Sequence, residues 1–282
     1  MSLSNPPKHT LAAARTNLIH EFTAAGITPA AVNADWLLSY ITGLQGIDFA
    51  LANDRALTGE EQQLLAELAA RRMAGEPVQY IVGSTEFYGR AFAVEPGVLI
   101  PRPETERFTE LVLELGGKRE TVLDVGTGSG VIAITVALER PGWRVWGSDI
   151  NPAAVALASR NALLLGASVS WFLSDLLAAV PNAEKTTMIA ANLPYLPESD
   201  QATVAPELAF EPASALYSGP DGINHAVALL DAVAELPGSR LIALELDPRN
   251  VGFMADMVRR TGFTDVQVVP DLTGRDRYLV FA

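Results

Sequence analysis

From residue 121 to the end of the chain, short runs rich in β-branched and aliphatic residues alternate with segments of helical periodicity. The runs that predict strands are Thr121–Val125, Arg144–Asp149, Val169–Leu173, Thr187–Ala191, Arg240–Glu245, Val266–Val269 and Tyr278–Phe281. Strands that alternate with helices in this way favour a parallel sheet covered by helices on both faces. The sequence therefore predicts an α/β fold for this part of the chain.

The first 75 residues have a different pattern, which predicts a small helical domain. Two apolar stripes at helical spacing are formed by Leu11, Leu18, Ile19 and Phe22, and by Val32, Trp36, Leu37 and Tyr40. The expected N-caps are Thr28 and Thr58, the second in a capping box with Glu61, and the expected helix ends are Gly26, Gly43 and Gly75. No residue here suggests chemistry, so we expect a docking or substrate-positioning role.

Residues 76–106 predict a linker built around a β-hairpin. The runs Val78–Gly83 and Ala91–Val94 have strand-forming composition and are separated by Gly89. Pro101 and Pro103 follow, and two prolines so close together hold the backbone extended. The predicted organisation is thus a helical domain at 1–75, a hairpin linker at 76–106 and an α/β domain at 107–282.

Composition limits the functions open to the chain. It has no cysteine, which excludes disulfides and thiol nucleophiles, and its three histidines are not at metal-ligand spacing, so no metal site is expected. The net charge of −13 disfavours direct nucleic-acid or membrane binding. No apolar run approaches the ~20 residues that cross a bilayer. The polar start, MSLSNPPKHT, does not resemble a signal peptide, so we expect a cytoplasmic protein.

A glycine-rich turn follows the first predicted strand of the α/β part. The sequence Gly126-Thr127-Gly128-Ser129-Gly130 leads into a predicted helix at Val131–Glu139, and Asp149 ends the second strand 19 residues after Gly130. Glycines at such a turn allow close approach of a ligand, and an acid at the second strand end can accept bonds from ribose hydroxyls. P-loop and nucleophile-elbow patterns are absent, and a dinucleotide fingerprint would need glycine at Val131. The pattern favours a nucleoside cofactor over a purely structural turn.

With Asp124 before it, the turn resembles the first motif of class I S-adenosylmethionine-dependent methyltransferases. The resemblance implies that Gly126, Thr127, Gly128, Ser129 and Gly130 form the cofactor bed and that Asp124 holds the methionine ammonium, directly or through water. It also implies that Asp175 faces the adenine amino group and that Leu176 packs on the ring. The alternative for Asp175 is a helix N-cap.

A second motif, Asn192-Leu193-Pro194-Tyr195, follows the fourth predicted strand and resembles the fourth motif of amino-group methyltransferases. An amide nitrogen is a poor nucleophile because its lone pair is delocalised. The Asn192 side-chain carbonyl and the Leu193 backbone carbonyl can hold a substrate NH₂ in line with a methyl donor, and Tyr195 can stack on the flat target group. Pro194 keeps Leu193 extended. An ordinary X-Pro turn is the alternative.

Leu193 stands where proline is usual in amide methylation, and Asn-Leu-Pro-Tyr is also the form of ribosomal RNA adenine dimethyltransferases. Adenine-N6 methylation of RNA is therefore the enzymatic alternative. A partner protein that binds the methyl donor without transferring the methyl group is the non-enzymatic one.

Longer segments separate these possibilities. Those that closely resemble the HemK/PrmC family are Arg71–Gly83, Glu86–Gly89, Val98–Glu106, Phe210–Pro212 and Asp271–Arg277. The resemblance implies a helical N-terminal domain, a β-hairpin linker and a class I (Rossmann-like) methyltransferase domain. The implied reaction uses S-adenosylmethionine to methylate the side-chain amide nitrogen (N5) of the glutamine in the Gly-Gly-Gln motif of peptide chain release factors, which act in translation termination.

The chain departs from that family pattern a second time at Glu245–Asn250, where Glu-Ile-Gly is expected. We expect this segment to lie away from the chemistry. The implied partner is the release factor, and no direct binding of nucleic acid is expected.

Overall fold

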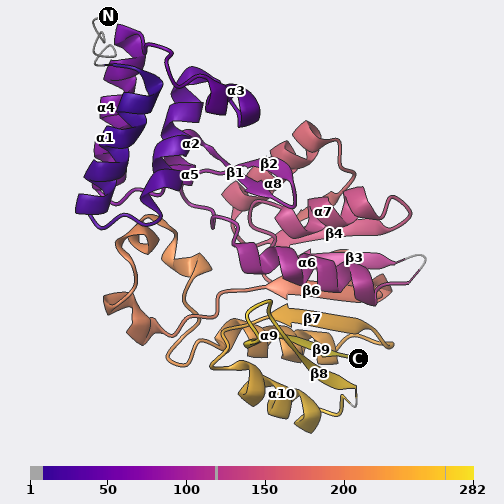
Figure 1. Ribbon diagram of the computed structural model, residues 1–282. Helices are drawn as coiled ribbons and strands as arrows, with labels where there is room; N and C mark the ends of the chain where they lie inside the picture. Colours follow the sequence, from indigo (N-terminus) through magenta and orange to yellow (C-terminus); the bar gives the residue numbers. More distant parts are fainter. Residues whose placement is uncertain (1–8, 118–119, 264) are drawn as a thin grey trace, which may run out of the picture. The chain divides into compact units, whose positions relative to one another are not determined.

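The computed structural model describes residues 9–117, 120–263 and 265–282 and divides into two compact units, one ending at Gly83 and the other beginning at Ser84 (Figure 1). Within the described residues, no helix is both long enough and apolar enough to span a membrane.

The first unit is helical, as predicted. Its helices are α1 (Leu11–Ala24), α2 (Ala30–Thr42), α3 (Gly46–Leu51), α4 (Gly59–Met73) and α5 (Val78–Val82). The predicted capping box is present at the start of α4, where Thr58 Oγ1 accepts from the Glu61 backbone N–H at 3.1 Å and the Glu61 carboxylate accepts from the Thr58 N–H at 2.8 Å. Their apolar faces share one core, which includes Phe22, Leu37 and Leu68.

Two details of the first unit differ from the prediction. Val32 and Tyr40 are 48% and 52% exposed, because α2 turns Ala34, Leu37 and Leu38 toward the core instead. The residue that caps α2 is Pro29, without a side-chain hydrogen bond, rather than Thr28.

The predicted strand at Val78–Gly83 is wrong, because these residues form helix α5. Val78 and Ile81 are three residues apart and both pack into the helical core. Their β-branched composition suggested a strand, but a spacing of three is helical, and burial of that face outweighs the weak strand preference. Helix α5 ends at Gly83, which has a left-handed backbone with φ of 74°.

The second unit contains a seven-stranded sheet with the order β5-β4-β3-β6-β7-β9-β8. The strands are β3 (Thr121–Val125), β4 (Arg144–Asp149), β5 (Ser170–Leu173), β6 (Met188–Asn192), β7 (Leu241–Glu245), β8 (Val266–Pro270) and β9 (Asp276–Phe281). The α/β fold is thus confirmed, with one exception to a fully parallel sheet. Strand β9 is antiparallel to β7 and β8, because the short connection from β8 permits only an antiparallel pair.

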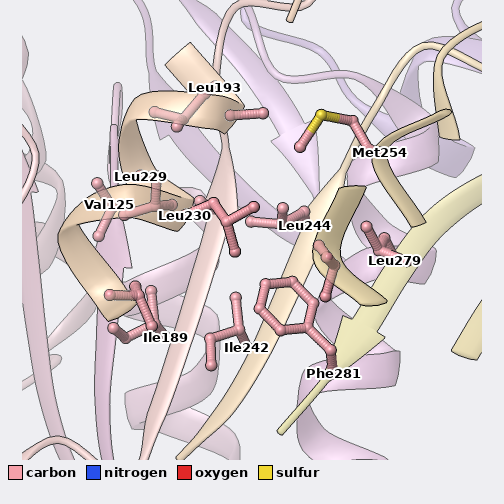
Figure 2. Close-up of a cluster of buried hydrophobic side chains, with 14 of the residues drawn as sticks. Val125, Ile189, Leu193, Leu229, Leu230, Ile242, Leu244, Met254, Leu279 and Phe281 are labelled. Atoms are coloured by element: carbon pink, nitrogen blue, oxygen red, sulfur yellow. The ribbon is translucent and has the colours of Figure 1, made fainter. Parts of the chain in front are cut away.

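Helices cover both faces of this sheet. On one face pack α9 (Asn224–Ala234) and α10 (Val251–Arg260), and the buried side chains between them and the sheet are called cluster one. Figure 2 shows part of it, with Leu229, Leu230 and Met254 from these helices above Ile242 and Phe281 of the sheet. On the other face pack α6 (Pro103–Leu115), α7 (Val131–Glu139) and part of α8 (Pro152–Leu165), and the buried side chains between them and the sheet are called cluster two. Successive strand residues alternate between the clusters, as a pleated strand requires.

The hairpin predicted around Gly89 is present, but its first strand is Ser84–Phe87 rather than Val78–Gly83, and an unpredicted helix start follows it. Strands β1 (Ser84–Phe87) and β2 (Arg90–Ala93) pair antiparallel around Tyr88 and Gly89, which both have positive φ. Residues 103–106, predicted as extended linker, are the first turn of α6. Pro103 is compatible with this helix because the first helical residue needs no backbone donor.

The segment between β6 and α9 contains short 3₁₀ turns, and α9 then completes the crossover from β6 to β7. They are η2 (Glu198–Ala202), η3 (Pro206–Phe210) and η4 (Ala213–Ala215), and a further turn, η1 (Ala183–Lys185), precedes β6. This irregular stretch carries residues onto one side of the cavity described next.

Candidate functional site

A cavity of about 1050 Å³, counting its open mouth, lies at the carboxyl ends of the parallel strands. The parallel strands deliver the predicted residues to a single sheet edge: the glycine-rich turn follows β3, Asp149 ends β4, Asp175 follows β5 and Asn192 ends β6. Strand β3 is flanked by β4 on one side and β6 on the other, so the crossovers diverge at this point. Ligands of open α/β sheets bind at such a switch point.

Most of the predicted site residues line this cavity. They are Gly126, Thr127, Gly128, Ser129, Asp149, Asp175, Leu176, Asn192, Leu193 and Pro194. Asp124, Gly130 and Tyr195 are not among the lining residues. Ten of the thirteen predicted residues therefore line the cavity, and the other three lie outside its lining.

The turn after β3 requires glycine at its two ends for reasons of both conformation and space. Gly126 and Gly130 have φ of 73° and 86°. A Cβ on Gly126 would lie 2.7 Å from Leu193 Cδ2, and one on Gly130 would lie 2.9 Å from Ile134 Cδ1. The backbone N–H groups of Gly126 and Thr127 donate to the Ser148 carbonyl at 2.9 Å, which fixes the turn against β4.

Asp124 orders this turn from behind. Its side chain has no exposed surface, and Oδ2 accepts from the Thr127 hydroxyl at 2.5 Å and from the Ala133 backbone N–H at 3.2 Å. Burial raises the pKa of Asp124 to about 7, against the effect of these hydrogen bonds. Oδ1 has no hydrogen-bond partner within the described residues, so it is the atom left for the predicted ammonium contact, which stays a prediction.

Asp149 joins two loops at the cavity wall. Its Oδ2 accepts from the Gly128 backbone N–H and its Oδ1 from that of Asn151, both at 2.9 Å. Burial raises the pKa of Asp149, and the backbone hydrogen bonds oppose this rise. Each carboxylate oxygen has a second lone pair, so the side chain can still accept bonds from a diol.

The residues after β5 exclude one alternative. No helix follows Asp175, and the side chain that accepts a downstream backbone bond is that of Ser174, from Ala179 at 2.9 Å. The interpretation of Asp175 as a helix N-cap is therefore wrong. Its carboxylate is exposed at the cavity beside Leu176, which has a positive φ of 46°.

At the Asn-Leu-Pro-Tyr turn, the asparagine amide is held at its amine end. Asn192 Nδ2 donates to Thr105 Oγ1 at 3.0 Å, which fixes the amine end of the side chain. Leu193 has its side chain in cluster one, as Figure 2 shows, against the bare Cα of Gly126. The leucine found in place of proline therefore packs into the core while the residue also lines the cavity. Tyr195 is half-buried, and burial together with the charge of Glu245 raises the pKa of its hydroxyl.

Two polar residues beside Asn192 were not predicted. Thr105 comes from the first turn of α6, and Glu245 is the register partner of Asn192 across β6 and β7. The segment beginning at Glu245 is expected to lie away from the chemistry, but its first residue is adjacent to Asn192 in the sheet. Strand order was the missing information, since a parallel register cannot be deduced from spacing along the chain.

The linker is also tied to the cavity. Arg102, which lines it, donates to Glu211 Oε1 at 2.5 Å, while Glu211 Oε2 accepts from the Ile100 backbone N–H at 3.0 Å. Asn151 Nδ2 donates to the Gly97 carbonyl at 2.9 Å. These contacts hold residues 97–102 as one wall of the cavity.

Comparisons with known proteins agree with this geometry. Residues 13–83 match the PrmC N-terminal domain, and residues 104–222 match the methyltransferase small domain. A release factor glutamine methyltransferase of Neisseria gonorrhoeae is 38% identical over 87% of this chain and 91% of its own length. One of Koribacter versatilis is 39% identical over 96% of this chain and 98% of its own. The chain belongs to the HemK/PrmC family of release factor glutamine methyltransferases.

A solved structure supports the fold of this family member. A methyltransferase from Pyrococcus furiosus superimposes with a TM-score of 0.52 at 17% identity, covering 77% of this chain and 98% of its own. The fold is thus that of class I, Rossmann-like methyltransferases.

S-adenosylmethionine is the cofactor of this methyltransferase, and the cavity fits it. The turn lacks a Cβ at Gly126 and Gly128, which allows a ligand to approach the backbone closely. A carboxylate at the end of β4 and an exposed carboxylate after β5 suit a sulfonium nucleoside with a diol and an amino group. Ile150, Leu176 and Val98 supply apolar surface for a flat ring.

Proposed function

We propose that this protein methylates the side-chain amide nitrogen (N5) of the glutamine in the Gly-Gly-Gln motif of peptide chain release factors. The observation that carries the proposal is the state of Asn192. Its amine end is engaged by Thr105 Oγ1 at 3.0 Å, which leaves the carbonyl oxygen of a cavity-lining residue as an acceptor. A carboxamide NH₂ is the donor that such an acceptor suits.

The turn supplies a second acceptor, the Leu193 backbone carbonyl. Two acceptors on one NH₂ group hold the nitrogen in a single orientation and favour its rehybridisation as it attacks. Tyr195 follows the two acceptors but is not among the residues that line the cavity, so its stacking on the flat amide stays a prediction. When bound, S-adenosylmethionine supplies an activated methyl group for in-line transfer.

The cofactor would be held by the residues of the glycine-rich turn and by the acids around it. Asp149 would accept from the ribose hydroxyls, Asp175 from the adenine amino group, and Asp124 Oδ1 would face the ammonium. Leu176 would pack on the adenine ring. The helical unit ending at Gly83 is proposed to dock the release factor.

One labelling experiment tests the proposal. The protein is incubated with methyl-labelled S-adenosylmethionine, a purified release factor and ribosomal RNA, and the label is located by mass spectrometry. We expect it on the glutamine of the Gly-Gly-Gln motif. A release factor with asparagine in place of that glutamine is the matched control and should stay unlabelled.

The other outcomes identify the alternatives. Label on RNA adenine, with a steep loss of activity on addition of salt, would replace the proposal by adenine-N6 methylation. Cofactor binding without transfer to either substrate would identify a partner protein that does not catalyse.

A further inference from the structure

Glu245 is a buried acid that the proposed reaction does not yet use. Its side chain is 1% exposed, and neither carboxyl oxygen is within hydrogen-bond geometry of a partner among the described residues, although the polar side chains of Thr105 and Asn192 are close enough to act on it. An unsatisfied buried carboxyl costs free energy, so its place in the fold calls for a reason.

The register of the sheet places Glu245 beside the substrate turn. It pairs with Asn192 on β6 and with Tyr278 on β9, so the three residues share one face at the carboxyl edge. The first turn of α6 covers that face. The Tyr278 hydroxyl donates to the Glu104 carbonyl at 2.8 Å, and Thr105 Oγ1 accepts from Asn192 Nδ2 at 3.0 Å.

The hydrogen bonds among Glu245, Thr105 and Asn192 can run in one of two directions from donor to acceptor. A carboxylate only accepts hydrogen bonds, whereas a hydroxyl donates one and accepts others. An ionised Glu245 would favour a Thr105 hydroxyl hydrogen turned toward its carboxylate. The lone pairs of that hydroxyl, which accepts from Asn192 Nδ2, would then be left for the amine. The Asn192 carbonyl then faces the cavity.

Protonation of Glu245 would reverse that direction. A neutral acid can donate to Thr105 Oγ1, which frees the hydroxyl hydrogen to bond the Asn192 carbonyl instead. The Asn192 amine would then face the substrate amine, donor against donor. Two donors cannot form a hydrogen bond with one another, so Asn192 would no longer hold the substrate amide.

We propose that Glu245 is a positioning residue for methyl transfer, which acts through the Thr105 hydroxyl to keep the Asn192 carbonyl turned toward the substrate amide. The inference rests on the proposed function. It requires no contact between Glu245 and the substrate.

The inference has a pH dependence with a defined sign. Burial raises the pKa of Glu245 to about 7; the polar side chains of Thr105 and Asn192 and the charge of Arg277 oppose the rise, and Glu104 adds to it. Tyr195 and Tyr278 also act on this region, and burial raises the pKa of both hydroxyls, so they stay neutral. The further charges around these two tyrosines are Arg102 and Asp271, and Asp271 pairs with Arg277. The glutamine amide does not titrate in this range. Turnover should therefore rise with pH as Glu245 ionises.

Four variants test the inference in the full-length protein with intact release factor. Glu245→Gln removes the charge, Thr105→Val removes the hydroxyl at nearly constant volume, and Thr105→Ser restores it. Thr109→Val is the matched control, because Thr109 is buried one turn further along α6 and, in the part of the chain that the structure describes, its hydroxyl donates to the Thr105 carbonyl and to no side chain. The measurements are kcat and KM between about pH 5.5 and about pH 8.5, and the Kd for the cofactor.

We expect Glu245→Gln and Thr105→Val to lower kcat roughly 10- to 100-fold, as a misplaced reactant does, with the cofactor Kd unchanged. The wild-type increase in kcat with pH should be absent from Glu245→Gln. Thr105→Ser should recover most of the lost turnover, and Thr109→Val should match the wild type.

Wild-type kcat and pH profile in Glu245→Gln would overturn the inference, as would equal activity of Thr105→Ser and Thr105→Val. If Glu245→Gln does not fold, the two Thr105 variants decide alone. A wild-type protein that transfers nothing to release factor would remove the proposed function and this inference with it. If the wild type is active and the Glu245 and Thr105 variants turn over at the same rate, only this inference is overturned and the proposed function stands.

Discussion

Asn192 is the residue on which turnover depends most directly, because its carbonyl is the proposed acceptor for the substrate amide. Asn192→Ala should lower kcat by ~10²–10³, the range for loss of one preorganised hydrogen-bonding group. Cofactor affinity should change little. Rates and the cofactor Kd are measured together on the same preparation. Unchanged turnover would show that the turn does not hold the substrate.

Asp149 is expected to matter for cofactor binding, whereas Asn192 is expected to matter for turnover. Asp149→Ala removes an acceptor with both oxygens at the cavity wall, so it should weaken cofactor binding by about 1.5–3 kcal/mol. Calorimetry measures the change. Glu95→Ala is a suitable control, since Glu95 forms only an exposed ion pair with Arg160. Equal affinities in the two variants would exclude Asp149 from the cofactor site.

The residues that the sequence identified and those it missed differ in how they reach the site. Gly126, Asp149 and Asn192 each stand at a strand end, and their motifs can be recognised in one short segment. Thr105 and Glu245 come from elements 87 and 53 residues away from Asn192, and only the α6 packing and the β6–β7 register bring them together. Local patterns contain no information about such contacts.

At the scale of elements, prediction succeeded where burial and turn chemistry agreed. Strand β3, strand β4 and helix α7 have the predicted bounds, because a buried apolar run is followed in each case by glycine or a polar turn. It failed at α5, where composition favoured a strand over a short helix. It also missed α6, since Pro103 was interpreted as the end of an extended segment rather than the start of a helix.

The junction of β3 and α7 offers a test of the element rather than of one contact. Gly130→Ala places a Cβ on a backbone with φ of 86° and within 3.0 Å of Ile134 and Ala158. Gly166→Ala has a similar φ of 71° at the end of α8 but meets nothing within 4 Å. We expect Gly166→Ala to cost about 1–2 kcal/mol of unfolding free energy, from the backbone alone.

Gly130→Ala should cost more than Gly166→Ala, because the crowded Cβ adds steric strain, and it should also weaken cofactor binding. Urea unfolding of both variants provides the comparison. Equal losses of stability would mean that the turn relaxes freely, in which case it does not form a rigid cofactor bed.

For the whole molecule, the pH dependence of stability follows from two buried carboxyls. Burial raises the pKa of Asp124 and of Glu245 to about 7. A raised carboxyl pKa means that the folded state binds the proton more tightly than the unfolded state. The contribution to stability is therefore full below the unfolded pKa, near 4, and is lost as pH rises through about 7.

The free energy of unfolding should accordingly fall by roughly 1 kcal/mol for each of these groups between about pH 6 and about pH 8. The net charge of −13 acts in the same direction, since repulsion grows above the isoelectric point of about 4.7. Urea unfolding of Glu245→Gln and of Asp124→Asn separates the two causes. Each variant should reduce the slope of the free energy of unfolding against pH. Asp231→Asn, on the exposed side of α9, is the control, because it removes a charge without removing a buried acid. If all three variants kept the wild-type slope, or flattened it equally, the buried carboxyls would not be its source, and the ionised Glu245 on which the orientation of Asn192 is argued to depend would lose its physical basis.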